Sequence, residues 1–240
     1  MPSKPAPLFS VITPSVGTRP RALALAIASV EAALEHARAQ AGLDPARVEM
    51  LVGFDAVDGQ RPESSLQNLR YFVLPRPQGV QSGFGNHIRH ALMGAARGSH
   101  LLLLDDDNAL APGAMASFLP HLEAEFIIGR IDTSRAFDVP FLPRPAAQSP
   151  QLAVPDAQVA EDAIRQGNID PLCLCLSREL AFVRGRGWAD EGGYESDFLN
   201  IRRYFRRARS VVRIDDVVGV YDAGRGLDAG GRNERQRKLP

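Results

Sequence analysis

A run of four leucines that ends in three consecutive aspartates constrains this chain more than any other feature of its sequence. The apolar segment Leu101–Leu104 is followed directly by Asp105, Asp106, Asp107 and Asn108. A short aliphatic run predicts a strand that is buried on both faces, as in parallel sheets. Three adjacent carboxylates repel one another, and removing them from water costs further free energy. A nearby cation would relieve both problems.

Two interpretations of this triplet are open on these residues alone. Mg²⁺ and Mn²⁺ take oxygen ligands, usually one or two carboxylates together with substrate phosphates. Ligands of open α/β sheets gather at the carboxyl ends of the strands, where the triplet is expected to lie. The alternative is a solvated acidic turn in which Asn108 caps a helix.

The chain before the triplet alternates between strand and helix patterns. Strands are expected at residues 8–13, 48–54, 69–74 and 101–104. Apolar residues recur at helical spacing from Leu23 to Leu34, and a second helix is expected from about Asn86 to Arg97. The turn signals from Pro14 to Pro20 are expected to end the first strand. This β-α-β-β-α-β order predicts a largely parallel sheet flanked by helices.

A second acidic stretch lies late in the chain, between Gly187 and Leu199. It carries four carboxylates through a glycine-rich turn into a helix expected from Asp197 to about Arg207. Anions stabilise helix N-termini, so capping is the simplest explanation. Four acids interleaved with aromatic residues and glycines exceed what a cap needs. The stretch is therefore a second candidate for a functional site.

Composition excludes some partners. The chain has 28 basic and 28 acidic residues, so no overall field favours nucleic acid or an anionic membrane. No secretory signal is visible, and no apolar run approaches the ~20 residues of a membrane span. The two cysteines, Cys173 and Cys175, complete no zinc site and are expected as small buried residues of a cytoplasmic protein.

The order of these features resembles the inverting family 2 glycosyltransferases, which have the GT-A fold and act on nucleotide-diphosphate sugars. The similarity rests on the following residues: Val11–Ser15 with Arg19–Pro20, Asp55 after the second strand, Gln78–Gly79, Asn86, Ala91 and Leu104–Asn108. It extends from about Phe9 to Arg207. It implies a mostly parallel central sheet flanked by helices, with a small acceptor-side subdomain. Residues 1–129 would form a Rossmann-like nucleotide-sugar half, 130–221 the acceptor-side half, and 222–240 a flexible Gly/Arg-rich tail.

The resemblance also implies which residues bind the donor. The donor, most simply a UDP-sugar, would contact Thr13, Pro14, Ser15, Asp55, Asn86, Asp105 and Asp106. Asp107 and Asp105 would hold Mn²⁺ or Mg²⁺ against the diphosphate. Arg89 and His90 could touch the diphosphate or be ordinary surface residues. Arg225 and Arg232 could fold over it or belong to a solvated tail.

On the acceptor side, the resemblance implies a carboxylate base at the start of the late helix. Glu195 aligns with the base position and Asp197 with the acid that follows, although Tyr194 stands where an acid is usual. Glu195 is therefore the expected base, and Asp197 is the alternative. Trp188, Asp190 and Glu191 would line the site for a saccharide or another hydroxyl acceptor, although Trp188 could equally pack in the core. The implied process is bacterial polysaccharide or glycoconjugate synthesis.

Two departures from the family keep other functions open. Many members have a C-terminal histidine that completes the metal site, but no histidine lies beyond Leu122 in this chain. Asp222 could substitute for it, or the central acids, phosphates and water could suffice. A nucleotidyltransferase that makes a sugar nucleotide is one alternative, and a non-catalytic sugar-nucleotide-binding protein is another. The sequence leaves the sugar, the acceptor and a homodimeric state undecided.

Overall fold

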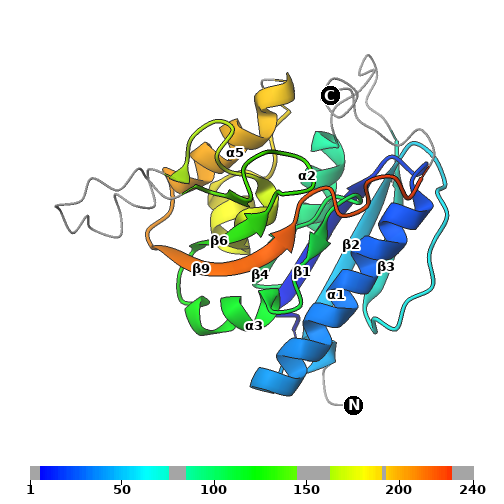
Figure 1. The fold of residues 1–240 in the computed structure, drawn as a ribbon, viewed down its shortest axis with the longest axis horizontal. Coiled ribbons are helices and arrows are strands. Elements are labelled where there is room, and N and C mark those ends of the chain that lie inside the picture. Colours follow the sequence, from blue (N-terminus) through cyan, green and yellow to red (C-terminus); the bar gives the residue numbers. More distant parts are fainter. Residues whose placement is uncertain (1–5, 76–84, 145–162, 191–192, 229–240) are drawn as a thin grey trace.

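The computed structural model describes residues 6–75, 85–144, 163–190 and 193–228. One nine-stranded sheet runs through them in the order β3-β2-β1-β4-β8-β6-β9-β5, with β7 paired to β6 (Figure 1). The strands are β1 Phe9–Ser15, β2 Val48–Asp55, β3 Leu69–Leu74, β4 His100–Leu103, β5 Ala109–Leu110, β6 Phe126–Asp132, β7 Phe141–Leu142, β8 Leu174–Ser177 and β9 Val211–Val220. The longer helices are α1 Pro20–Ala41, α2 Asn86–Ala95 and α5 Ser196–Phe205, and α3 is the short helix Ala114–Phe118.

The first half of the chain folds as its pattern predicts. β3, β2, β1 and β4 pair in parallel, and all residues of β1 and β4 are buried. α2 packs on β1 and β2, where a Cβ on Gly53 would collide with Ile88. This close approach explains a glycine inside a buried strand.

The first strand is longer than predicted, because it continues through Pro14 to Ser15. β4 pairs with β1 only as far as Ile12, so beyond that point β1 has a sheet partner on the β2 side alone. Proline is tolerated at such an edge, where no ladder hydrogen bond is lost.

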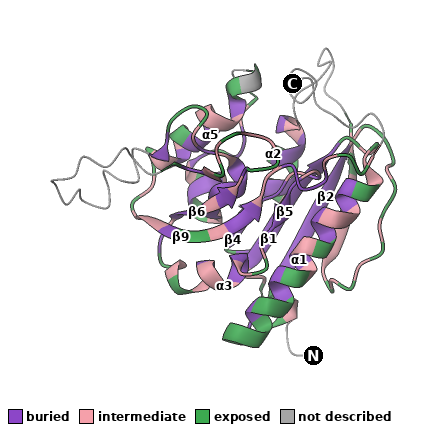
Figure 2. Cartoon of the chain, viewed as in Figure 1, coloured by how far each residue is buried: buried purple, intermediate pink, exposed green. Residues whose placement is uncertain are grey.

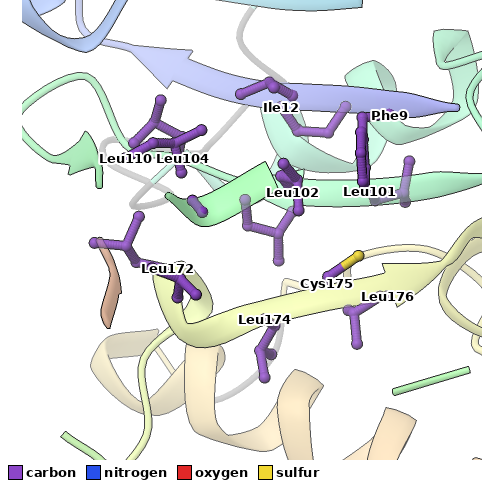
Figure 3. Packing of buried hydrophobic residues seen from close by; sticks show 14 of the residues in the cluster. Phe9, Ile12, Leu101, Leu102, Leu104, Leu110, Leu172, Leu174, Cys175 and Leu176 are labelled. Atoms are coloured by element: carbon purple, nitrogen blue, oxygen red, sulfur yellow. The ribbon is translucent and has the colours of Figure 1, made fainter. Parts of the chain in front are cut away.

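The second half extends the same sheet with mixed pairing. β8 lies antiparallel between β4 and β6, and β9 pairs in parallel with β6. The predicted halves 1–129 and 130–221 therefore share one sheet. Figure 3 shows Phe9, Leu102 and Cys175 on the neighbouring strands β1, β4 and β8, within one apolar cluster. Both cysteines are buried and free, as predicted.

Burial follows the sheet and the inner faces of its helices, as Figure 2 shows for α1. The buried positions of α1 include Leu23, Ile27, Val30 and Leu34, which are the positions expected from the helical spacing. No helix in the described part of the chain combines the length and the hydropathy that a membrane crossing requires.

Candidate functional site

The three aspartates lie where the sequence predicts them, on the loop that follows β4. Asp106 is completely buried, and its Oδ2 accepts a hydrogen bond from Ser15 Oγ at 2.6 Å. Ser15 Oγ in turn accepts the backbone N–H of Gly17 at 3.1 Å. The end of β1 is thereby fixed to the loop of residues 105–108, which we call the acid loop.

Arg19 neutralises two of the three aspartates. It lies immediately before α1, and its guanidinium donates to Asp106 Oδ1 and to Asp107 Oδ2. Burial lowers the pKa of Arg19, but the attraction of both carboxylates outweighs it and holds that pKa above its usual value. Burial raises the pKa of Asp106 to about 7, because Arg19 only partly offsets the lost hydration. Burial also raises the pKa of Asp107.

Arg89 of α2 neutralises the third aspartate and joins two parts of the site. It is buried, donates to Asp105 Oδ1 at 2.5 Å, and lies 3.5 Å from Asp197 Oδ1 at the start of α5. Its guanidinium carbon lies 5.2 Å from the ring centroid of Trp188. The interpretation of Arg89 as an ordinary surface residue is therefore wrong. Nothing in its helical pattern marks it as buried, since the acids that accompany it are distant in sequence.

Asp170 is an acid of this cluster that the sequence analysis missed. It accepts the backbone N–H of Leu172 at 2.9 Å, at the start of the short helix before β8. Burial raises the pKa of Asp170 to about 8, and the negative charges of Asp105 and Asp197 add to this rise. Burial also raises the pKa of Asp197, with a further contribution from Asp105. A lone aspartate beside a proline gave no signal in the sequence.

Asn86 connects the start of α2 to the segment that precedes α5. Its side chain is buried, and its Oδ1 accepts from Trp188 Nε1 at 2.8 Å and from Ser196 Oγ at 3.1 Å. Its Nδ2 donates to Asp190 Oδ1 at 2.8 Å. The predicted donor ligand Asn86 thus uses its side chain to hold the segment before α5.

The remaining residues expected at the donor lie along the carboxyl ends of β1 and β2. Asp55 Oδ1 lies 3.4 Å from Nε2 of His87, a residue the sequence analysis did not single out. Thr13 is completely buried, and its hydroxyl has no hydrogen-bond partner among the described residues. Pro14 faces Gly85, where an added Cβ would lie 3.1 Å from the proline Cβ.

The residues expected at the acceptor divide into buried and exposed positions. Trp188 is 2% exposed and contacts Tyr204, which fits its alternative role in core packing better than stacking on a sugar. Glu195 is exposed, and its Oε1 accepts from Gln166 Nε2 at 2.7 Å. Glu191 lies outside the described residues.

The start of the predicted tail contacts the acid loop. The backbone N–H of Asp222 donates to Asn108 Oδ1 at 2.7 Å, and that of Gly224 donates to the Asp107 carbonyl at 2.9 Å. The alternative interpretation of the triplet expected Asn108 to cap a helix. Its side chain instead accepts the backbone N–H of Asp222. Asp228 accepts the backbone N–H of Ala22 at 2.8 Å and so caps the start of α1. Arg232 lies outside the described residues.

Arginines pair with all three carboxylates of the acid loop, where the divalent ion is expected. Asp106 uses one carboxylate oxygen for Ser15 and the other for Arg19, which also binds Asp107. Asp105 pairs with a different arginine, Arg89. Within residues 6–75, 85–144, 163–190 and 193–228, no three His, Cys, Asp or Glu side chains are grouped to hold a metal. The Mn²⁺ or Mg²⁺ expected from the resemblance stays a prediction.

Comparison with known proteins identifies the fold. No protein-family model matches the chain, and no curated protein does. The solved structure of S. aureus TarS residues 1–349 superimposes with a TM-score of 0.65 at 14% identity, covering 89% of this chain and 60% of that one. The complex of the same fragment with UDP-GlcNAc gives a TM-score of 0.65 at 14% identity and covers 97% and 61%. Its complex with UDP gives 0.63 at 16% identity and covers 89% and 60%.

These likenesses establish the fold and nothing finer. The chain has the same fold as TarS, a mostly parallel curled sheet flanked by helices, as the sequence predicted. It spans about 60% of the length of the TarS fragment.

Proposed function

We propose that this chain transfers a sugar from a nucleotide-diphosphate donor, a UDP-sugar, to a hydroxyl group of an acceptor, with inversion at the anomeric carbon. The observation that carries the proposal is Arg89, which contacts Asp105 of the acid loop and Asp197 of α5. Donor-side and acceptor-side acids thus meet at one buried guanidinium. The similarity of the fold to TarS also supports the proposal, because structures of TarS in complex with UDP and with UDP-GlcNAc have been solved.

The reaction breaks one bond at the anomeric carbon and forms another. The bond between the anomeric carbon and the β-phosphate oxygen breaks, and its electron pair leaves with UDP. The acceptor oxygen forms a bond to that carbon from the opposite face and gives its proton to a carboxylate. A base positioned in this way typically contributes about 10²–10⁴-fold to the rate.

Asp197 and Glu195 are the two candidates for the base. The sequence favours Glu195, but its exposed carboxylate is bonded to Gln166. Asp197 lies beside Arg89, and its raised pKa brings it closer to neutral pH, where a general base is most effective. The geometry therefore favours Asp197.

The test measures free UDP released from UDP-sugars in the presence of saccharide acceptors. Asp197→Asn is expected to lower turnover by about 10²-fold or more while UDP still binds. Glu195→Gln is expected to stay within a few-fold of the wild type, as is the control Glu35→Gln on the exposed end of α1. A large loss in Glu195→Gln alone would return the role of base to Glu195.

Other outcomes would point to the alternative functions. Pyrophosphate released from UTP and a sugar 1-phosphate, with no UDP release, would identify a nucleotidyltransferase. UDP binding without turnover on any acceptor would leave a non-catalytic sugar-nucleotide-binding protein.

A further inference from the structure

The side chain of Arg19 supplies a positive charge to the acid loop. The Arg19 guanidinium bridges two carboxylates, because one terminal nitrogen pairs with Asp106 and the other with Asp107. The Arg19 side chain is 16% exposed and that of Asp107 is 17% exposed, so the pair lies just below the surface. The Nε–H of Arg19 has no acceptor in the described part of the chain. Among the described residues, the hydrogen bonds of the Arg19 side chain go to Asp106 and Asp107 of the acid loop.

The chain fixes Arg19 in this place. Arg19 directly precedes Pro20, the first residue of the 22-residue helix α1. The ring of Pro20 restricts its φ angle and so fixes the backbone where the helix begins. Asp228 binds the backbone N–H groups of Arg21 and Ala22, so the start of the helix is held by a different acid. The Arg19 side chain therefore takes no part in capping the helix, although the Arg19 carbonyl accepts the backbone N–H of Leu23 at 3.0 Å.

We propose that Arg19 is the resident counter-cation of the acid loop and competes with divalent ions for Asp106 and Asp107. A divalent ion that bridged Asp106 and Asp107 would compete with the guanidinium for Asp106 Oδ1 and Asp107 Oδ2, and the other oxygen of Asp106 already accepts from Ser15. It would also meet a second positive charge at hydrogen-bond distance. The wild-type loop therefore binds Mn²⁺ weakly, and loss of Arg19 opens the site.

The test is calorimetric titration of MnCl₂ into the full chain without nucleotide. The wild type is expected to bind Mn²⁺ weakly. Arg19→Gln is expected to bind it at least tenfold more tightly, because two carboxylates lose their internal partner. Asp107→Asn added to Arg19→Gln is expected to remove this gain. The matched control is Arg21→Gln, because Arg21 is exposed and, in the part of the chain that the structure describes, its guanidinium donates to the Leu227 carbonyl at 3.4 Å and to no carboxylate.

A second variant keeps the test decisive if Arg19→Gln does not fold. Arg19→Lys keeps one positive charge but lacks the fork that spans both carboxylates. It is expected to bind Mn²⁺ more tightly than the wild type and less tightly than Arg19→Gln. Tight Mn²⁺ binding by the wild type, or no gain in a folded Arg19 variant, would overturn the proposal. Neither result depends on sugar transfer, so the proposed function stands or fails separately.

Discussion

Removal of the Asn86 side chain should both destabilise the protein and impair turnover. Asn86 is completely buried and forms hydrogen bonds with Trp188, Ser196 and Asp190. Asn86→Ala removes all three bonds. A typical intramolecular hydrogen bond contributes roughly 0.5–1.5 kcal/mol, and each buried polar group left without a partner costs about 1–3 kcal/mol. The expected loss is therefore on the order of 4 kcal/mol.

The loss should be visible in thermal unfolding and in kinetics. For a chain of this size, 1 kcal/mol corresponds to roughly 2–4 °C, so Tm should fall by about 10 °C. Below the new Tm, turnover should fall more than UDP affinity, because the lost bonds hold the segment that leads to Asp197. The matched control Asn68→Ala removes a half-buried amide that donates to the Ala46 and Val48 carbonyls near the start of β2. It should lower Tm by a few degrees without changing turnover relative to UDP affinity.

Asn86→Asp separates the contribution of charge from that of shape. The new carboxylate can still accept from Trp188 and Ser196, but it meets Asp190 at the position where Nδ2 lies 2.8 Å away. Repulsion raises the pKa of the new acid in the folded state, so the penalty grows as pH rises above its unfolded pKa of about 4. Stability should therefore recover in part at low pH. If Asn86→Ala unfolds within 3 °C of the wild type, the role assigned to this amide is wrong.

Three further changes probe separate parts of the structure. Asp55→Ala should weaken UDP binding by roughly 10- to 100-fold, since a hydrogen bond donated to a charged carboxylate contributes about 1.5–3 kcal/mol, and calorimetry measures this directly. Asp170 has a raised pKa of about 8, so it binds protons more tightly in the folded chain and stability is lost as pH rises from about 4 to 8. Asp170→Asn should accordingly unfold at a higher temperature than the wild type at pH 9 and not at pH 4; equal differences at both values would exclude this explanation. Glu49 is buried and accepts hydrogen bonds from Ser10, Arg70 and Arg97. These bonds outweigh the effect of burial and lower the pKa of Glu49. Its contribution to folding stability is therefore present above its unfolded pKa and is lost as pH falls below that value. Glu49→Gln should cost about 3 kcal/mol at pH 7 in denaturant unfolding while UDP affinity stays unchanged.

The parallel half of the fold could be predicted because its signals are local. Each strand there is a short apolar run, and α1 and α2 carry apolar residues at helical spacing. The position of the acid loop followed from the general rule that ligands gather at the carboxyl ends of parallel strands. The antiparallel insertion of β8 between β4 and β6 could not be predicted, because an apolar run does not specify its neighbours.

The side chains that pair with the aspartates could not be predicted from local sequence patterns. Arg19 lies 87 positions before Asp106, and Asp197 lies 108 positions after Arg89. Only the fold brings these charges together. The sequence of the triplet suggested a bound metal ion, because Arg19, which pairs with Asp106 and Asp107, lies in a distant segment of the chain.

We propose that the carboxyl ends of β1, β2 and β4 form the binding site for a nucleotide sugar. Hydrogen–deuterium exchange of the wild-type protein with and without UDP-GlcNAc tests it most directly. Slower exchange is expected at residues 13–19, 55–57, 86–90 and 105–108 upon addition of the nucleotide sugar. Unchanged exchange in all four segments at saturating UDP-GlcNAc, or protection confined to other parts of the sheet, would contradict the claim.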